Sequence, residues 1–145
     1  KPKKSKKYHQ EFSGPRKPYS LKGRVEANVY HGKVVGRIGE ICKDLGYTIS
    51  SYPTDLHVEG KSKKSVLMEV KTGLDTYSRY TAIGQLFYYS SDLPKNTKLV
   101  AVFPKPKIPE FKKVLAKLGI EYVTYTKGKK QPKFDSSLDR ILKAL

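Results

Sequence analysis

The sequence predicts a single α/β domain in which helices cover both faces of a mixed central sheet. A chain of 145 residues is long enough for one domain with a substantial core and too short for two. Segments with helical spacing of apolar residues alternate with short strand-like runs in the order α-βββ-α-β-α-β. The formal net charge of +17 is far more than solubility requires and indicates a polyanionic partner, with nucleic acid as the first candidate.

The first predicted helix and three strands make up the N-terminal half of this core. The helix starts near Val25, has apolar residues at i, i+4, i+7 and i+11, and ends at Gly46; these residues are Val34, Ile38, Ile41 and Leu45. Strands are predicted at 47–52, 55–59 and 66–71, and the last two are joined by a polar turn at 60–64.

The second half continues with a helix over 79–91, a strand over 98–103, a helix over 108–118 and a strand over 121–125. We assign residues 21–126 to the core and residues 1–20, which hold seven Lys and Arg without an apolar period, to a flexible basic arm. Residues 127–145 are predicted to form a basic tail with a short C-terminal amphipathic helix.

Two acids and a lysine meet at the end of the third strand. Residues i and i+2 of a strand face the same side, so Glu69 and Lys71 point together. The alternating apolar residues Val66, Met68 and Val70 point the other way. Asp55 starts the preceding strand and comes within reach of the same spot. Converging carboxylates favour a hard cation such as Mg²⁺ or Mn²⁺, beside which a lysine can act on a water or a phosphate. This is chemistry for cutting phosphodiesters.

A purely structural interpretation is also open. Asp55 can be a turn residue, and Glu69 with Lys71 an exposed ion pair, which is the better interpretation of an isolated Glu-x-Lys in a lysine-rich chain. The surroundings favour the site, because a Pro-x-Asp is followed, after 13 residues that include a hairpin, by an apolar strand that ends in Glu-Val-Lys.

The segments Pro53-Thr54-Asp55 and Glu69-Val70-Lys71 resemble the motif of the PD-(D/E)XK phosphodiesterase superfamily, with one residue inserted between the proline and Asp55. The resemblance implies a restriction-endonuclease-like fold. It also implies that Asp55 and Glu69 bind the metal together with the backbone carbonyl of Val70, and that Lys71 serves the attacking water.

Two further motifs are similar to those of the RecB-like branch: Lys71-Thr72-Gly73 matches K-T-G, and Gln85 with Tyr89 matches Q-x-x-x-Y. Gln85 and Tyr89 share a helix face. In the family this face looks onto the active site, with the glutamine near the catalytic lysine and the tyrosine near DNA. Core packing of Tyr89 and a solvated Gln85 are the alternatives.

The RecB-like branch also tends to place a histidine on the first helix as an extra metal ligand. His31 lies three residues before Val34, on the inward stripe of that helix, and fits this role. A buried histidine bonded to a backbone carbonyl is the alternative, and resolvase-like members use a glutamate, for which Glu26 or Glu40 would serve less well because both lie off the stripe. An iron–sulphur cluster needs four cysteines, and Cys42 alone excludes it.

Basic and aromatic residues near the motifs are candidates for gripping the DNA backbone and stacking bases, although each can equally be a solvated surface residue. They are Lys61, Lys63 and Lys64 at the hairpin tip, and Tyr77, Arg79 and Tyr80 before the Gln85 helix.

We therefore expect a Mg²⁺- or Mn²⁺-dependent DNA nuclease. A Holliday-junction-resolvase-like endonuclease remains open, and with it a homodimer to which the C-terminal helix contributes. So does a non-catalytic DNA-binding module, although such a module has no physical reason to keep two uncompensated acids together. The single cysteine favours a reducing, cytoplasmic location, and no apolar run approaches the roughly 18 residues that span a bilayer.

Overall fold

A computed structural model describes residues 21–51 and 54–145, and its element order matches the predicted α-βββ-α-β core. The elements are α1 (Leu21–Asp44), β1 (Thr48–Ser50), β2 (Leu56–Glu59), β3 (Ser65–Val70), α2 (Thr76–Ser90), β4 (Lys98–Pro104), α3 (Pro109–Lys117), β5 (Ile120–Thr126), β6 (Lys133–Phe134) and α4 (Ser136–Lys143). The arm predicted over 1–20, Pro53 and the end of the strand predicted at 47–52 lie outside the described residues.

One sheet carries all six strands in the order β1-β2-β3-β4-β5-β6. The pairs β1–β2, β2–β3 and β5–β6 are antiparallel, whereas β3–β4 and β4–β5 are parallel. The two parallel connections run through α2 and α3, as parallel strands require a crossover. The sheet is therefore mixed, and the predicted α/β architecture of a mixed sheet between helices is confirmed.

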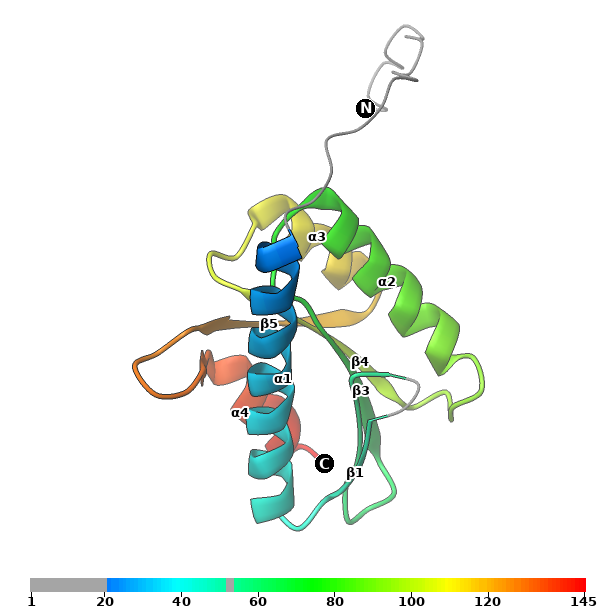
Figure 1. The fold of residues 1–145 in the computed structure, drawn as a ribbon. Helices are drawn as coiled ribbons and strands as arrows, with labels where there is room; N and C mark the ends of the chain where they lie inside the picture. Colours follow the sequence, from blue (N-terminus) through cyan, green and yellow to red (C-terminus); the bar gives the residue numbers. More distant parts are fainter. Residues whose placement is uncertain (1–20, 52–53) are drawn as a thin grey trace, which may run out of the picture.

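Helices cover both faces of this sheet (Figure 1). On one face, α1 and α4 bury an apolar cluster that includes Val34, Ile38 and Leu142. On the other, α2 and α3 bury a second cluster that includes Leu86 and Phe111. All six residues of β3 are buried because the strand lies inside the sheet and is covered on both sides.

Two glycines end helices as the sequence predicts. Gly46 follows α1 with φ +78°, and Gly119 follows α3 with φ +72°. This left-handed conformation carries no steric cost for glycine and lets the chain turn away from the helix axis. None of the helices in the described part of the chain has the length and apolar character needed to cross a membrane.

The C-terminal segment is part of the packed domain, which corrects the boundary placed after residue 126. Strand β6 pairs with β5, and the apolar side chains of α4 are buried in the same cluster as those of α1. Asp135 caps α4 and also accepts hydrogen bonds from the backbone N–H (3.0 Å) and hydroxyl (2.8 Å) of Thr124 in β5. The apolar face of α4 is thus used within the chain and is not available for the dimer contact considered above.

Candidate functional site

Asp55 lies where β2 and β3 separate. The ladder between these strands ends with the pair Leu56–Met68. Two residues further along β3, the backbone N–H of Val70 donates to Asp55 Oδ2 at 2.8 Å instead of to a backbone carbonyl of β2. The side chain of Asp55 therefore takes the place of the next ladder partner, and its carboxylate is fixed against the end of β3.

Glu69 meets Asp55 at this point. Its side chain is 3% exposed, and burial, followed by the negative charge of Asp55, raises the pKa of Glu69 to about 8. Burial also opposes ionisation of Asp55, but hydrogen bonds from His31, the Val70 N–H and Glu69 outweigh it and lower the pKa of Asp55. Near pH 7, Glu69 therefore holds a proton and Asp55 is the anion.

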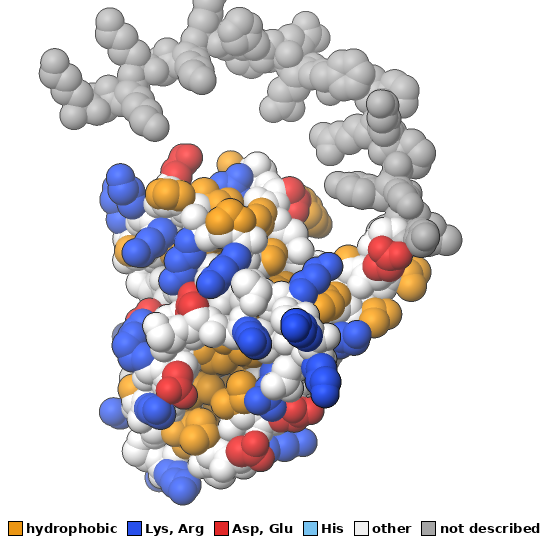
Figure 2. Space-filling model, turned by 90° about the vertical axis from the view of Figure 1, so that its left-hand side faces the viewer, with side chains coloured by type: hydrophobic (Ala, Val, Ile, Leu, Met, Phe, Trp, Pro, Cys, Tyr) orange, Lys and Arg blue, Asp and Glu red, His pale blue; other side chains and the backbone are white. Residues whose placement is uncertain are grey.

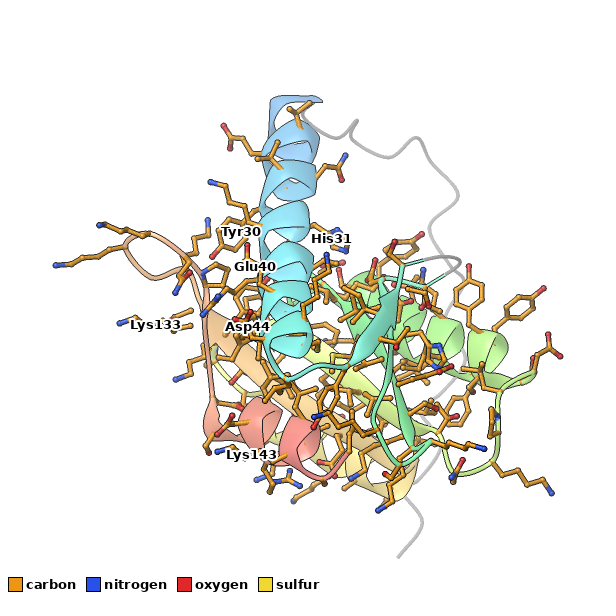
Figure 3. The ribbon with its side chains drawn as sticks, turned by 90° about the horizontal axis from the view of Figure 1, so that it is seen from below. Tyr30, His31, Glu40, Asp44, Lys133 and Lys143 are labelled. Atoms are coloured by element: carbon orange, nitrogen blue, oxygen red, sulfur yellow. The ribbon has the colours of Figure 1, made fainter. Side chains whose placement is uncertain are left out.

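His31 of α1 reaches the same carboxylate. Its Nε2 lies 3.1 Å from Asp55 Oδ1, and Figure 3 shows His31 and Tyr30 on different sides of α1. The hydrogen bond to Asp55 raises the pKa of His31 against the opposing effect of burial, and the backbone carbonyl of Val70 adds to the rise. Two glutamates were also considered on this helix. Glu40 is bonded to Arg37 at 3.1 Å instead, and Glu26 lines a cavity next to Thr72.

Lys71 is held from three sides. Its Nζ donates to Gln85 Oε1 on α2 at 2.6 Å. Its backbone N–H donates to Val102 of β4, and its carbonyl accepts from the hydroxyl of Tyr125 in β5 at 2.9 Å. The structure thus brings together His31, Asp55, Glu69, Lys71 and Gln85.

Tyr89 and the tyrosines nearer the start of α2 differ in exposure. Tyr89 packs against the α2–α3 cluster, and its ring lies edge-on to Tyr88 with centroids 5.4 Å apart. Tyr77 and Tyr80 are 72% and 70% exposed.

The predicted start of this helix at residue 79 is wrong. Asp75 caps it and accepts from the backbone N–H of Ser78, so Tyr77, Arg79 and Tyr80 lie on α2 itself. Arg79 is half-buried, and its guanidinium lies 5.9 Å from the centroid of the Phe111 ring, so its contact with DNA stays a prediction.

The lysines of the β2–β3 turn are distant from the site. Lys61, Lys63 and Lys64 are exposed, but the turn joins the ends of β2 and β3 opposite to Asp55 and Val70. Val70 lies six residues after Lys64 along an extended strand, which corresponds to roughly 20 Å. These lysines therefore lie at the hairpin tip, as predicted, at the end of the strands away from the site, and their contact with the DNA backbone stays a prediction.

A cavity next to Thr72, the residue after Lys71, was not predicted from the sequence. It has a volume of about 510 Å³, and its lining includes Tyr30, Thr72, Lys105 and Lys127. The Tyr30 hydroxyl is buried without a hydrogen-bond partner, and Lys127 Nζ lies 5.0 Å from the centroid of the Tyr30 ring. Lys and Arg side chains are spread over the face shown in Figure 2.

A signal for this cavity exists in the sequence. Lys105 and Lys127 each follow the end of a strand, β4 and β5, and the carboxyl ends of parallel strands open at one edge of a sheet, where ligands bind.

The donor atoms at the site suit a divalent cation. Two carboxyl groups, one imidazole and the Val70 carbonyl match the oxygen-rich ligand sets of Mg²⁺ and Mn²⁺. The N–H and C=O of one strand residue point to the same side, so the Val70 carbonyl faces the edge where its N–H meets Asp55. Within 21–51 and 54–145, no three His, Cys, Asp or Glu side chains already surround a common point. Because the raised pKa keeps Glu69 protonated near pH 7, the binding of a cation to its carboxyl group would require Glu69 to release this proton.

No protein-family model matches the chain, and no curated protein matches it. Among solved structures, it is similar to the crystal structure of a repair endonuclease from Pyrococcus abyssi, with 19% identity and a TM-score of 0.46. The likeness covers 74% of this chain and 48% of that one, so the chain spans about half the length of that structure.

Proposed function

We propose that this domain is a divalent-metal-dependent nuclease that hydrolyses phosphodiester bonds of DNA. One observation carries the proposal: Lys71, held by Gln85, lies directly after the strand on which Glu69 meets Asp55. An acid pair that can hold a cation, beside a positioned ammonium group, suits metal-assisted hydrolysis of a phosphate ester.

Each side chain has a role in this proposal. Asp55, Glu69, His31 and the Val70 carbonyl would hold the cation, which supplies Lewis-acid polarisation of the phosphate and acidifies a bound water. Lys71 orients the attacking water and offsets the negative charge that develops on the phosphate. Gln85 accepts one N–H of the Lys71 ammonium group and so limits the directions in which the others can donate.

The contact between Lys71 and Gln85 also supports placement in the RecB-like branch, in which the glutamine of Q-x-x-x-Y lies near the catalytic lysine. Tyr89 shares the inward side of α2 with Gln85 and packs on the core, so its contribution is to seat α2 against the sheet.

The charge of the chain supports DNA as the substrate. Lys105 and Lys127 line the cavity next to Thr72, and we expect their ammonium groups to contact phosphates of bound DNA. A non-catalytic DNA-binding module is the rival, but binding does not require a buried, protonated Glu69 next to Asp55, and burying this group costs stability.

The test uses the full chain with labelled single-stranded, duplex and four-way-junction DNA, with Mg²⁺, with Mn²⁺ and with chelator. We expect cleavage of at least one substrate with metal and none with chelator. Glu69→Gln should bind the same DNA without cutting it. Binding without cleavage of any of the three substrates by the parent chain would overturn the proposal in favour of the module.

A further inference from the structure

The solvent-facing side of α2 is aromatic and uncharged. In a chain with 30% charged residues, the only charged residue between Thr76 and Ser90 is Arg79, and Arg79 is turned onto Phe111. Three tyrosines of this helix, Tyr77, Tyr80 and Tyr88, are 72%, 70% and 77% exposed. Aromatic rings exposed to this extent on one element indicate a surface for a partner.

Gly84, on the same side of α2, opens into a hollow lined by Thr81, Gly84, Gln85, Tyr88 and Tyr89. Tyr77, Tyr80, Gly84 and Tyr88 follow one another at spacings of three and four residues and share one helix face. A Cβ on Gly84 would meet nothing within 4 Å, so packing does not require glycine there. Glycine in a helix interior costs about 1 kcal/mol relative to alanine. What glycine provides at this position is an open hollow of about 370 Å³ above the backbone.

The hollow adjoins the proposed catalytic residues. Its lining includes Gln85, whose Oε1 accepts the hydrogen bond from Lys71. Tyr88 also lines it, and the edge-on contact with Tyr89 limits the movement of the Tyr88 ring. A strand bound with a phosphate at Lys71 would therefore have its neighbouring nucleotides next to the rings of α2.

We propose that Tyr77, Tyr80 and Tyr88, which share an exposed face of α2 with Gly84, form a stacking surface for unpaired bases, and that the preferred substrate is DNA with a single-stranded segment beside the scissile bond. This rests on the proposed nuclease function and adds the substrate class. Aromatic side chains stack on the faces of bases, and a duplex keeps these faces inside its own stack. The outer side of α2 offers no cation for a phosphate, so it suits bases and not the backbone.

Charge argues against a second copy of the chain as the occupant of this face. Two molecules that each carry +17 repel one another over the distance of a dimer contact, whereas the same charge attracts a polyanion. The lysines of the chain would hold the phosphates, and α2 would hold the bases of the same strand.

Binding measured without metal tests the proposal independently of cleavage. Fluorescence anisotropy with chelator compares a single-stranded oligonucleotide with a duplex of the same sequence. Tyr88→Ala and Tyr80→Ala should each weaken single-strand binding roughly tenfold and leave duplex binding within about twofold, whereas Tyr88→Phe should bind as the parent does. Val114→Ala, which trims an exposed apolar side chain of α3 (40% exposed), is the matched control and should change neither.

Gly84→Leu separates the hollow from the stability of the helix. Leucine is a better helix former than glycine, so the melting temperature should stay the same or rise, while the side chain fills the hollow and weakens single-strand binding.

Three results would overturn the proposal. Unchanged single-strand binding in Tyr80→Ala, Tyr88→Ala and Gly84→Leu would show that the rings do not contact DNA. Equal losses on single strand and duplex would mean that they do not distinguish unpaired bases. A concentration-dependent dimer in sedimentation that Tyr88→Ala abolishes would assign the face to a second copy. If the protein binds single strands through these rings but cleaves no DNA, the proposed nuclease function is overturned and the stacking surface stands.

Discussion

Lys71 Nζ donates a hydrogen bond of 2.6 Å to Gln85 Oε1, and this contact joins the end of β3 to the middle of α2. The carbonyl of the same lysine is held by the Tyr125 hydroxyl at 2.9 Å. Both the backbone and the ammonium group of Lys71 are therefore positioned before any substrate arrives, and preorganised charge is the main source of catalysis in such sites.

Lys71→Ala should lower kcat for DNA cleavage by roughly 100-fold or more, because a positioned acid–base or charge-stabilising group contributes on that order. Gln85→Ala should lower kcat by about tenfold, with little change in KM, since the ammonium group remains but is less well oriented. Single-turnover cleavage with saturating enzyme measures both. Gln131→Ala, an exposed glutamine in the loop before β6, is the control; an equal loss there would contradict a specific role for Gln85.

The metal-free protein should lose stability as the pH rises from 5 to 8. Glu69 has a raised pKa of about 8 in the folded state, so in this window the native state binds more protons than the unfolded state and the free energy of unfolding falls with pH. The raised pKa of His31 acts in the same direction. Urea unfolding in chelator should show a decrease of more than about 1 kcal/mol.

Glu69→Gln removes one of the two titrating groups and should reduce this dependence to the part that His31 contributes, which leaves the variant more stable than the parent at pH 8. A slope as steep as that of the parent would place the titration elsewhere.

Binding of Mn²⁺ should release a proton near pH 7, because Glu69 has to ionise in order to bind a cation. Calorimetry in two buffers that differ in ionisation enthalpy measures the number released. His31→Ala should weaken Mn²⁺ binding by about tenfold or more. Glu40→Ala on the same helix, 67% exposed and paired with Arg37, should have no effect and serves as the control.

Lys105 and Lys127 should account for part of the salt dependence of DNA binding. Each phosphate contact contributes about −0.9 to the slope of log K against log salt on duplex DNA. The double variant Lys105→Ala, Lys127→Ala should therefore flatten the slope by up to about two units. The matched double variant Lys61→Ala, Lys63→Ala changes two lysines of the β2–β3 turn, at the other end of the strands, and should change the slope less. The reverse ranking would move the DNA surface to the hairpin.

Asp135→Ala should destabilise the domain by about 2 kcal/mol, because it removes a helix cap and leaves hydrogen-bond donors of Thr124 without their acceptor. Burial opposes ionisation of Asp135, but hydrogen bonds from Ser137, Thr124 and Lys107 outweigh it and lower its pKa to about 2. The contribution of Asp135 should therefore be complete above about pH 4 and fade as the pH falls toward 2.

Asp139→Ala provides the comparison for this variant. Asp139 lies on the same helix, is 65% exposed and pairs only with Lys143 among the ion pairs of the described residues. Its loss should cost less than about 0.5 kcal/mol. Equal midpoints in chemical unfolding of the two variants would contradict the role given to Asp135.

Most residues of the candidate site could be identified from local patterns in the sequence. The two-residue period of β3 predicts that Glu69 and Lys71 share one face of the sheet, which is the α2 side. Asp55 and Gln85 were identified as their neighbours from the motifs in which they occur. Contacts that depend on distant segments were not predictable in this way. The packing of Arg79 on Phe111 joins different helices. A helical period likewise shows that α4 has an apolar face but not which surface covers it.

The position of α4 also determines when the site can form during synthesis. Residues of α1 share their apolar cluster with residues of α4 about 100 positions later, and the Tyr47 hydroxyl donates to the carbonyl of Leu142 at 2.7 Å. Domains fold as units while the chain leaves the ribosome. The helix that carries His31 therefore completes its apolar packing only after α4 has emerged from the ribosome. A nascent or truncated chain should lack an ordered form of the proposed metal site, even though it already contains every candidate ligand.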